Sequence, residues 1–284
     1  MIRWLARMVV GLAVLVAIAL STLFVLSDRV INKRYPFKEY AISVPADSAA
    51  LAQGQRMVKI RCDGCHGDSL QGSEFFDEPM IARIPAPNVP ARLANLTDAE
   101  FAGFMRSGIR KNGTSSFIMP PPGFYHVSDS DLGALIAYLR SLPVSNNTLP
   151  PPSYRLLGRL GVVTGQFKPI VVDFDTTQER VGQDPASATT RQGEYLARLI
   201  CTECHGLKLV GSAGPPAPTP SLAMAAGYSP EEFTALLRTG TPRLPSTQLS
   251  LMRETALRSL TYLTDAEIQA IHGYLKELPA TGVP

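Results

Sequence analysis

Two copies of one short motif constrain this chain more than any other feature. Cys62-Asp63-Gly64-Cys65-His66 lies in the first half of the chain and Cys201-Thr202-Glu203-Cys204-His205 in the second. In a C-x-x-C-H motif the two thiols can bond the vinyl groups of a porphyrin as thioethers, and the next histidine can bind the iron from one side. The pattern therefore predicts two covalently bound haem c groups, with His66 and His205 as axial ligands.

All four cysteines of the chain lie in these motifs, so none is left for a disulfide. The alternatives are a thioredoxin-type redox pair or a zinc site that shares four thiolates. Both leave the histidine after each second cysteine unexplained, and the zinc site would also need two distant motifs to meet. The haem interpretation is therefore favoured.

An apolar run near the N-terminus predicts a membrane anchor. It extends over 19 residues from Met8 to Leu26, and at about 1.5 Å per residue it spans roughly 28 Å, close to the hydrocarbon thickness of a bilayer. A cleaved signal peptide usually has a shorter apolar region and a small-x-small cleavage site, which residues 27–30 do not offer. We expect one transmembrane helix within residues 1–30, with residues 4–26 contacting the membrane.

The orientation of this helix follows from the haem rather than from charge. Basic residues lie on both sides of the run, so the positive-inside rule alone does not orient it. Bacterial haem c is attached outside the cytoplasmic membrane, so residues from about Asp28 onward should be periplasmic. Four basic residues, Arg29, Lys33, Arg34 and Lys38, would then face the lipid headgroups.

Residues 44–143 are predicted to form the first haem unit. Helices are expected at 49–61, running into the first motif, at 99–107 after a capping box, and at 129–141 before a proline. Methionine is the usual sixth ligand in cytochromes c, because a soft thioether favours Fe(II). Met119 lies between the last two helices in a proline-stiffened loop and is the predicted ligand.

Other residues of the first unit fit that role less well. Met57 and Met105 lie in amphipathic helices, and Met80 follows the first motif too closely to reach the far face of a porphyrin. His126 is the main rival of Met119, although a histidine in such a loop is more often a surface residue near the haem edge. Residues 144–190 carry no motif and are expected to form a connector that packs across the first unit, with a short helix at 154–163 and an extended segment at 166–175.

The region 191–284 repeats the first unit. Besides the motif, four pairs of segments match in the same order: residues 53–56 with 192–195, 67–73 with 206–212, 100–108 with 232–240, and 137–143 with 273–279. Superposing the two Arg-x-Gly segments makes Met252 the counterpart of Met119 and the predicted second sixth ligand. Met224 falls on the wrong side of that segment, and His272 falls inside the closing helix expected at 265–278.

Each half resembles a small class I cytochrome c domain. The resemblance implies that the helix before each motif crosses the closing helix at a glycine and an aromatic residue, here Gly54 with Tyr138 and Gly193 with Tyr274. It also implies that a carbonyl of a proline loop accepts a hydrogen bond from the second ring nitrogen of the ligating histidine. Pro87 is the candidate for His66, and the choice within residues 215–220 is open for His205.

The implied fold is mainly α, with an N-terminal transmembrane helix followed by two tandem class I cytochrome c domains. A narrower resemblance rests on Ala86-Pro87-Asn88, Met119-Pro120, Tyr125, Ser128-Asp129-Ser130-Asp131-Leu132, Ala137-Tyr138-Leu139, Arg155, Arg159 and Gly193-Glu194-Tyr195-Leu196. On these residues the chain is similar to the membrane-bound cytochrome c subunits of periplasmic sugar, alcohol and aldehyde dehydrogenases. That resemblance implies redox protein partners within a membrane complex.

The net charges of the two haem units agree with electron transfer inside an assembly. Residues 44–142 hold nine basic and ten acidic side chains, and residues 191–284 hold eight of each, so the net charge of +3 arises beside the anchor. Near-neutral haem units steer charged partners weakly. The sequence has no basic stripe interleaved with aromatic residues, which is the pattern that would indicate nucleic-acid binding.

The leading functional hypothesis is a membrane-anchored dihaem cytochrome that relays single electrons in a periplasmic respiratory or photosynthetic chain. It would have two six-coordinate irons, no small-molecule substrate and no catalytic site of its own. A dihaem enzyme such as a peroxidase is the alternative, and it needs an open iron beside an acid or base. The only unassigned histidines for that role are His126 and His272. A haem-based sensor ranks third, because no signalling domain is attached.

Overall fold

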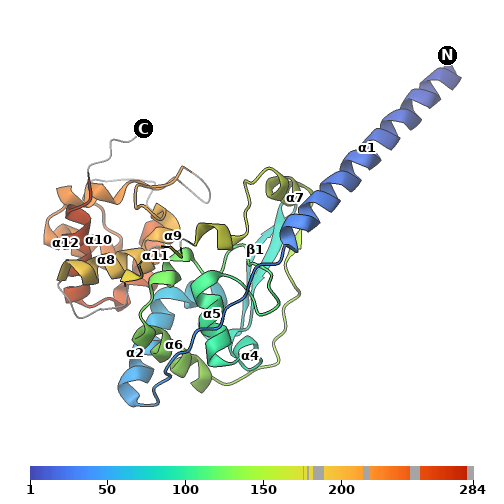
Figure 1. The fold of residues 1–284 in the computed structure, drawn as a ribbon. Coiled ribbons are helices and arrows are strands. Elements are labelled where there is room, and N and C mark those ends of the chain that lie inside the picture. Colours follow the sequence, from blue (N-terminus) through green and yellow to red (C-terminus); the bar gives the residue numbers. More distant parts are fainter. Residues whose placement is uncertain (175, 178, 182–188, 214–217, 244–249, 280–284) are drawn as a thin grey trace.

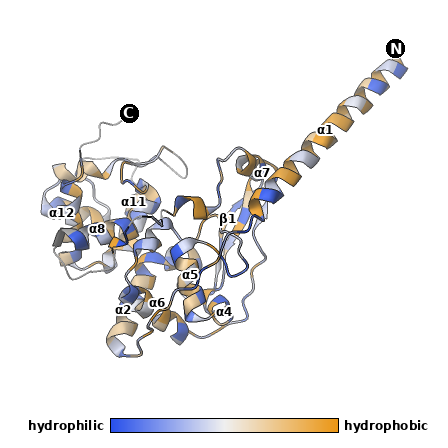
Figure 2. Cartoon of the chain, viewed as in Figure 1, coloured by the Kyte–Doolittle hydropathy of each residue, from blue (hydrophilic) through white to orange (hydrophobic). Residues whose placement is uncertain are grey.

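The computed structural model describes residues 1–174, 176–177, 179–181, 189–213, 218–243 and 250–279. One long helix, α1 (Ile2–Ile31), projects away from a mainly helical body (Figure 1). It is long and apolar enough to cross a membrane, and its most apolar stretch is not buried against the rest of the chain. Hydrophobic colouring predominates along its middle, with hydrophilic residues at its N-terminal end and close to its junction with the body (Figure 2).

The body holds two groups of helices. The first unit contains α2 (Ser48–Arg61), α3 (Asp63–His66), α4 (Val89–Leu93), α5 (Asp98–Ser107), the 3-10 helix η1 (Pro122–His126) and α6 (Asp129–Ser141). The second unit contains α8 (Thr189–Ile200), α9 (Thr202–His205), η4 (Leu222–Gly227), α10 (Pro230–Thr239), α11 (Ser250–Arg258), η5 (Leu260–Tyr262) and α12 (Asp265–Lys276).

The two units have matching helix starts. The predicted capping box at Thr97 is present at the start of α5, and equivalent boxes begin α10 at Ser229 and α12 at Thr264. Each box satisfies backbone N–H groups that have no partner inside the helix. In both units an arginine near the end of the middle helix, Arg106 or Arg238, pairs with the first aspartate of the closing helix. The repeat seen in the sequence is therefore also a repeat of contacts.

A small antiparallel sheet was not predicted. Its strands β1 (Ser73–Glu78), β2 (Ala82–Ala86) and β3 (Ser153–Tyr154) are ordered β1-β2-β3. The first strand lacks a regular alternation of buried and exposed residues, so it carries no period-two signal. The sheet joins the connector to the first unit.

The connector differs from its prediction in two respects. Its helix α7 (Leu156–Val163) begins two residues late, because Tyr154 pairs with Ala82 in the sheet. The extended segment expected at 166–175 is wrong, since η2 (Ile170–Asp173) forms there. Pro169 precedes this turn, and the Ile170 amide donates to the Ser116 carbonyl at 2.8 Å. As expected, the connector packs on the first unit.

The helix crossings expected from the resemblance are confirmed. A Cβ atom on Gly54 would overlap the Ala134 carbonyl and lie 2.8 Å from the Cβ of Tyr138 on α6. A Cβ atom on Gly193 would likewise overlap the Ala270 carbonyl and lie 2.9 Å from the Cβ of Tyr274 on α12. Only glycine allows the two backbones of each pair to approach this closely.

This crossing can be tested in the second unit. We expect Gly193→Ala to lower the free energy of unfolding by about 1–3 kcal/mol, because the added methyl group forces the two helices apart. Gly273→Ala is the matched control on α12: a Cβ atom there meets nothing within 4 Å, and the residue is exposed. It should raise helix stability by about 0.5–1 kcal/mol. Denaturant unfolding followed by circular dichroism measures both; equal effects would contradict the crossing.

Candidate functional site

The first motif is shaped by the end of one helix and the start of another. The Cys62 amide donates to the Val58 carbonyl at 2.8 Å, and the His66 amide donates to the Cys62 carbonyl at 2.9 Å. Gly67 then reverses the chain with a φ of 78°. This local path brings both thiols and the imidazole of His66 to one short stretch of backbone.

His66 is oriented by the proline loop, as the resemblance implied. Its Nδ1 lies 2.8 Å from the carbonyl oxygen of Pro87, which fixes the ring and leaves Nε2 on the opposite side for a metal ion. The side chain is buried, and burial lowers its pKa while the Pro87 hydrogen bond raises it. The neutral ring is the form that binds iron.

The second motif reproduces this arrangement. Nδ1 of His205 lies 2.9 Å from the carbonyl oxygen of Pro220, so the open choice within residues 215–220 falls on its last proline. Leu70 and Leu209 take the same left-handed backbone, with φ of 56° and 57°. The stretch after each motif is therefore built in the same way in both units.

No disulfide joins any of the four cysteines, all of which lie in described parts of the chain. Burial raises the pKa of Cys62 and of Cys201 to about 12 and that of Cys65 to about 11. In the described part of the chain, no group of three or more histidine, cysteine or acidic side chains could hold a metal ion, so the four-thiolate zinc site does not form. The unpaired thiols beside an oriented histidine fit haem c.

Met119 lies in the loop before η1, where it was predicted. Its amide donates to Oγ of Ser116 at 3.1 Å, and the same hydroxyl donates back to the Met119 carbonyl. Met57 and Met105 are buried core residues, as their helical positions indicated, and Met80 is exposed. The loop is therefore held at the residue expected to supply the thioether.

The expected surface location of His126 is wrong. The side chain is buried, because η1 packs against α8 of the second unit. Its Nδ1 accepts a hydrogen bond from the Val181 amide at 3.3 Å. Burial, and secondarily the charge of Arg198, lowers its pKa to about 4. His126 therefore belongs to the contact between the units.

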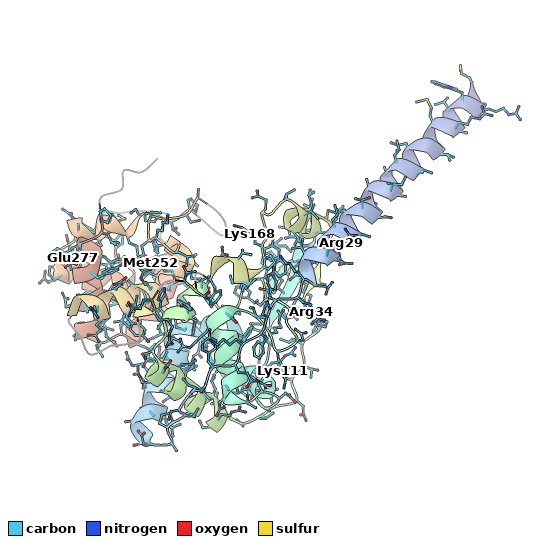
Figure 3. The ribbon with its side chains drawn as sticks, in the orientation of Figure 1. Arg29, Arg34, Lys111, Lys168, Met252 and Glu277 are labelled. Carbon is cyan, nitrogen blue, oxygen red and sulfur yellow. The ribbon has the colours of Figure 1, made fainter. Side chains whose placement is uncertain are left out.

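In the second unit Met252 lies within α11 rather than in a loop (Figure 3). It is partly buried and packs against the hydrophobic core. Met224 is exposed, whereas His272 lies inside α12 as expected. Its ring stacks on Phe233 at 4.7 Å between centroids, and its Nε2 lies 3.1 Å from the Ala225 carbonyl oxygen.

Arg61 joins the two motifs and was not singled out by the sequence. It directly precedes Cys62, and its guanidinium donates to Glu203, between the cysteines of the second motif, at 2.8 Å and to the Ile200 carbonyl at 3.5 Å. It also lies 5.6 Å from the centroid of the Phe124 ring. The side chain is 9% exposed, and its Nε is buried without a hydrogen-bond partner. Its charge acts to lower the pKa of all four thiols.

Further contacts fix the units on either side of Arg61. Arg56 of α2 forms a bidentate ion pair with Glu267 of α12, at 2.7 and 2.9 Å. The Tyr195 hydroxyl of α8 donates to Asp131 of α6 at 2.5 Å. A Cβ atom on Gly123 would overlap the Arg198 carbonyl, so η1 and α8 lie in close contact. The two motifs therefore face one another across a packed junction.

Comparison with known proteins agrees with this geometry. Residues 51–143 match the family described as cytochrome c, and residues 188–275 match the family described as cytochrome c oxidase, cbb3-type, subunit III. The chain thus contains two cytochrome c domains in tandem, and such domains bind haem c.

Its relatives include subunits of dehydrogenases. The cytochrome c subunit of alcohol dehydrogenase (quinone) from Gluconacetobacter polyoxogenes is 30% identical over 275 residues, covering 82% of this chain and 57% of that protein. The fructose dehydrogenase cytochrome subunit of Gluconobacter japonicus is 26% identical over 261 residues, covering 78% and 51%. The gluconate 2-dehydrogenase cytochrome c subunit of Pantoea cypripedii is 30% identical over 179 residues, covering 56% and 38%. The chain spans about half the length of the first of these relatives.

The burial of His126 predicts a pH dependence of stability. Its folded pKa, about 4, lies below its ordinary value, so as pH falls below about 6.5 the unfolded state takes up a proton that the folded state does not. The stability that neutral His126 contributes is complete above that pH and is lost as pH falls toward 4. His126→Asn, which keeps an acceptor for the Val181 amide, should flatten this part of the profile. Denaturant midpoints at pH 7 and 4.5 measure it; an unchanged slope would contradict the assignment.

Proposed function

We propose that this chain is a membrane-anchored dihaem cytochrome c that relays single electrons in the periplasm as a subunit of a dehydrogenase complex. The observation that carries the proposal is the junction at Arg61, because one side chain contacts both haem-attachment motifs. Two attachment sites held face to face suit transfer between two groups within one chain. The relatives named as dehydrogenase cytochrome subunits support a dehydrogenase as the electron donor.

Each residue of the two sites has a role in this proposal. Cys62 and Cys65 hold one haem c, and Cys201 and Cys204 hold the other. His66 and His205 are the proximal ligands, whose rings the carbonyls of the two prolines orient. Met119 and Met252 are the sixth ligands. When bound, each haem supplies an iron that alternates between Fe(III) and Fe(II).

The anchor is α1, which would place the two cytochrome domains on the periplasmic side. Residues 4–26 would lie in the membrane, and the basic residues that follow would lie at the headgroups. Co-purification from detergent-solubilised membranes tests the partnership; a chain that purifies without a dehydrogenase would contradict it.

The peroxidase alternative gains no support from the two histidines it needs. His272 stacks on Phe233 and contacts a backbone carbonyl, and His126 accepts a bond from the Val181 amide. Both side chains have packing roles between or within the units. A relay with two six-coordinate irons is therefore the better account of these residues.

Replacing the methionines tests the ligand assignment. We expect Met119→Ala and Met252→Ala each to remove about half of the weak methionine-to-iron charge-transfer band of the oxidised protein and to lower one of two reduction potentials, because a thioether favours Fe(II). Met224→Ala is the control, since that side chain is exposed. Near-infrared absorption and a spectroelectrochemical titration measure both effects. Two unchanged potentials in either ligand variant would show that assignment to be wrong.

Replacing Arg61 tests the junction. A buried positive charge disfavours the ferric state, so Arg61→Gln should lower both potentials by tens of millivolts, on the order of 1 kcal/mol. Arg56→Gln is the matched control, because it breaks an ion pair across the same interface that does not involve a motif residue. Glu203→Gln should shift potentials in the opposite direction. If Arg61→Gln moved only one potential, the guanidinium would not act on both haem groups.

A further inference from the structure

Helix α7 of the connector has an exposed apolar face that the electron relay does not use. Leu156, Leu157, Leu160 and Val163 are 41, 48, 47 and 37% exposed. Their spacing places them on one side of the helix, while Gly158 and Val162 are buried on the other. The sole charged residue of this helix is Arg159.

Arg159 attaches α7 to the end of α1. Its guanidinium donates to Asp28 and to Oγ of Ser27, both at 2.7 Å, and lies 4.2 Å from the centroid of the Phe24 ring. Ser27 is fully buried by this contact. The position of α7 along the axis of α1 is therefore fixed at residues 24–28.

This attachment determines the depth of α7 if α1 spans a bilayer. Phe24 belongs to the apolar run and lies two residues before its end at Leu26, about 3 Å along the helix axis. Arg159, whose guanidinium lies over the Phe24 ring, is part of α7. The connector helix therefore lies at the boundary between hydrocarbon and headgroups rather than in bulk water.

The turn between β1 and β2 extends the same surface. Met80 and Ile81 are 53 and 41% exposed. The Leu157 amide donates to the Met80 carbonyl at 2.9 Å, and the Arg155 amide donates to the Ile81 carbonyl at 2.8 Å. Gly158 allows this approach, because a Cβ atom there would overlap the Ile81 carbonyl. Six large apolar residues thus lie on two neighbouring segments beside the anchor.

We propose that α7 and the β1–β2 turn form a second membrane contact, with their apolar side chains seated in the lipid interface next to α1. An exposed apolar patch of this kind marks an interaction site, and its continuity with the anchor identifies lipid as the occupant. Arg29 and Arg34, at the base of α1, supply basic side chains at the headgroup level (Figure 3). This inference rests on the proposed anchoring by α1.

Single-cysteine labelling tests the contact on the full-length protein with haem bound. The native cysteines are consumed as thioethers, so an introduced cysteine is the only free thiol. Leu157→Cys probes α7, Leu15→Cys probes the anchor, and Leu257→Cys is the control on the second unit, 56% exposed. Each variant is placed in nanodiscs of phosphatidylcholine and phosphatidylglycerol and treated with a charged, membrane-impermeant maleimide. We expect Leu157→Cys and Leu15→Cys to react at least tenfold more slowly than Leu257→Cys.

The outcomes separate the two proposals. Slow reaction at position 15 with fast reaction at 157 would leave the anchor intact and overturn the lipid contact of α7. The nanodiscs hold no partner protein, so this is also the result expected if a partner, rather than lipid, covers this face. Fast reaction at position 15 would overturn anchoring by α1 and the contact together. Leu160→Cys provides a second reading of the same face, and the haem absorption spectrum checks that each variant is folded.

Discussion

The carbonyl oxygen that orients each motif histidine is the constraint on which the rest of both units depends. An imidazole can bind iron through one nitrogen in a fixed direction only if its other nitrogen has a partner. Pro87 and Pro220 supply that partner, at 2.8 and 2.9 Å. Proline loops suit this task, because proline has a fixed φ, which limits the movement of the loop, and has no backbone N–H that would need a hydrogen-bond partner. These two carbonyl oxygens therefore fix the direction in which His66 and His205 can bind iron.

The junction adds a second constraint, because a buried charge lies between the two motifs. Removing a guanidinium from water is costly unless its hydrogen-bonding groups find partners. Arg61 has Glu203, the Ile200 carbonyl and the Phe124 ring, yet its Nε is unsatisfied. A stability argument alone does not explain such a residue, since an apolar side chain would fill the same space at lower cost. A charge that acts on both attachment sites gives it a reason to be there.

The sequence was informative where a single residue determines the geometry. The pairs Gly54–Tyr138 and Gly193–Tyr274 could be predicted from the resemblance to class I cytochrome c domains, and glycine is what allows these close crossings. It was uninformative where two distant segments meet. The sequence does not predict the burial of His126 or of Arg61, because both are buried by packing between the units. The sheet was missed for a similar reason: its third strand comes from the connector, and two residues carry no periodicity. The helix around Met252 has no counterpart at Met119, which lies in a loop, so the repeat does not predict it.

The connector links the first unit to α1, the proposed membrane anchor. A single transmembrane helix leaves the domains free to tilt and rotate about the point where it leaves the bilayer. Here α7 is bonded to the end of α1 through Arg159 and to the first unit through β3 and the Arg155–Asp77 ion pair. The first unit is therefore held against the anchor by two successive rigid contacts. Since the junction at Arg61 in turn holds the second unit on the first, one chain of contacts runs from the end of α1 to both motifs. If α1 spans a bilayer as proposed, these contacts hold both haem-attachment motifs at a fixed height above it.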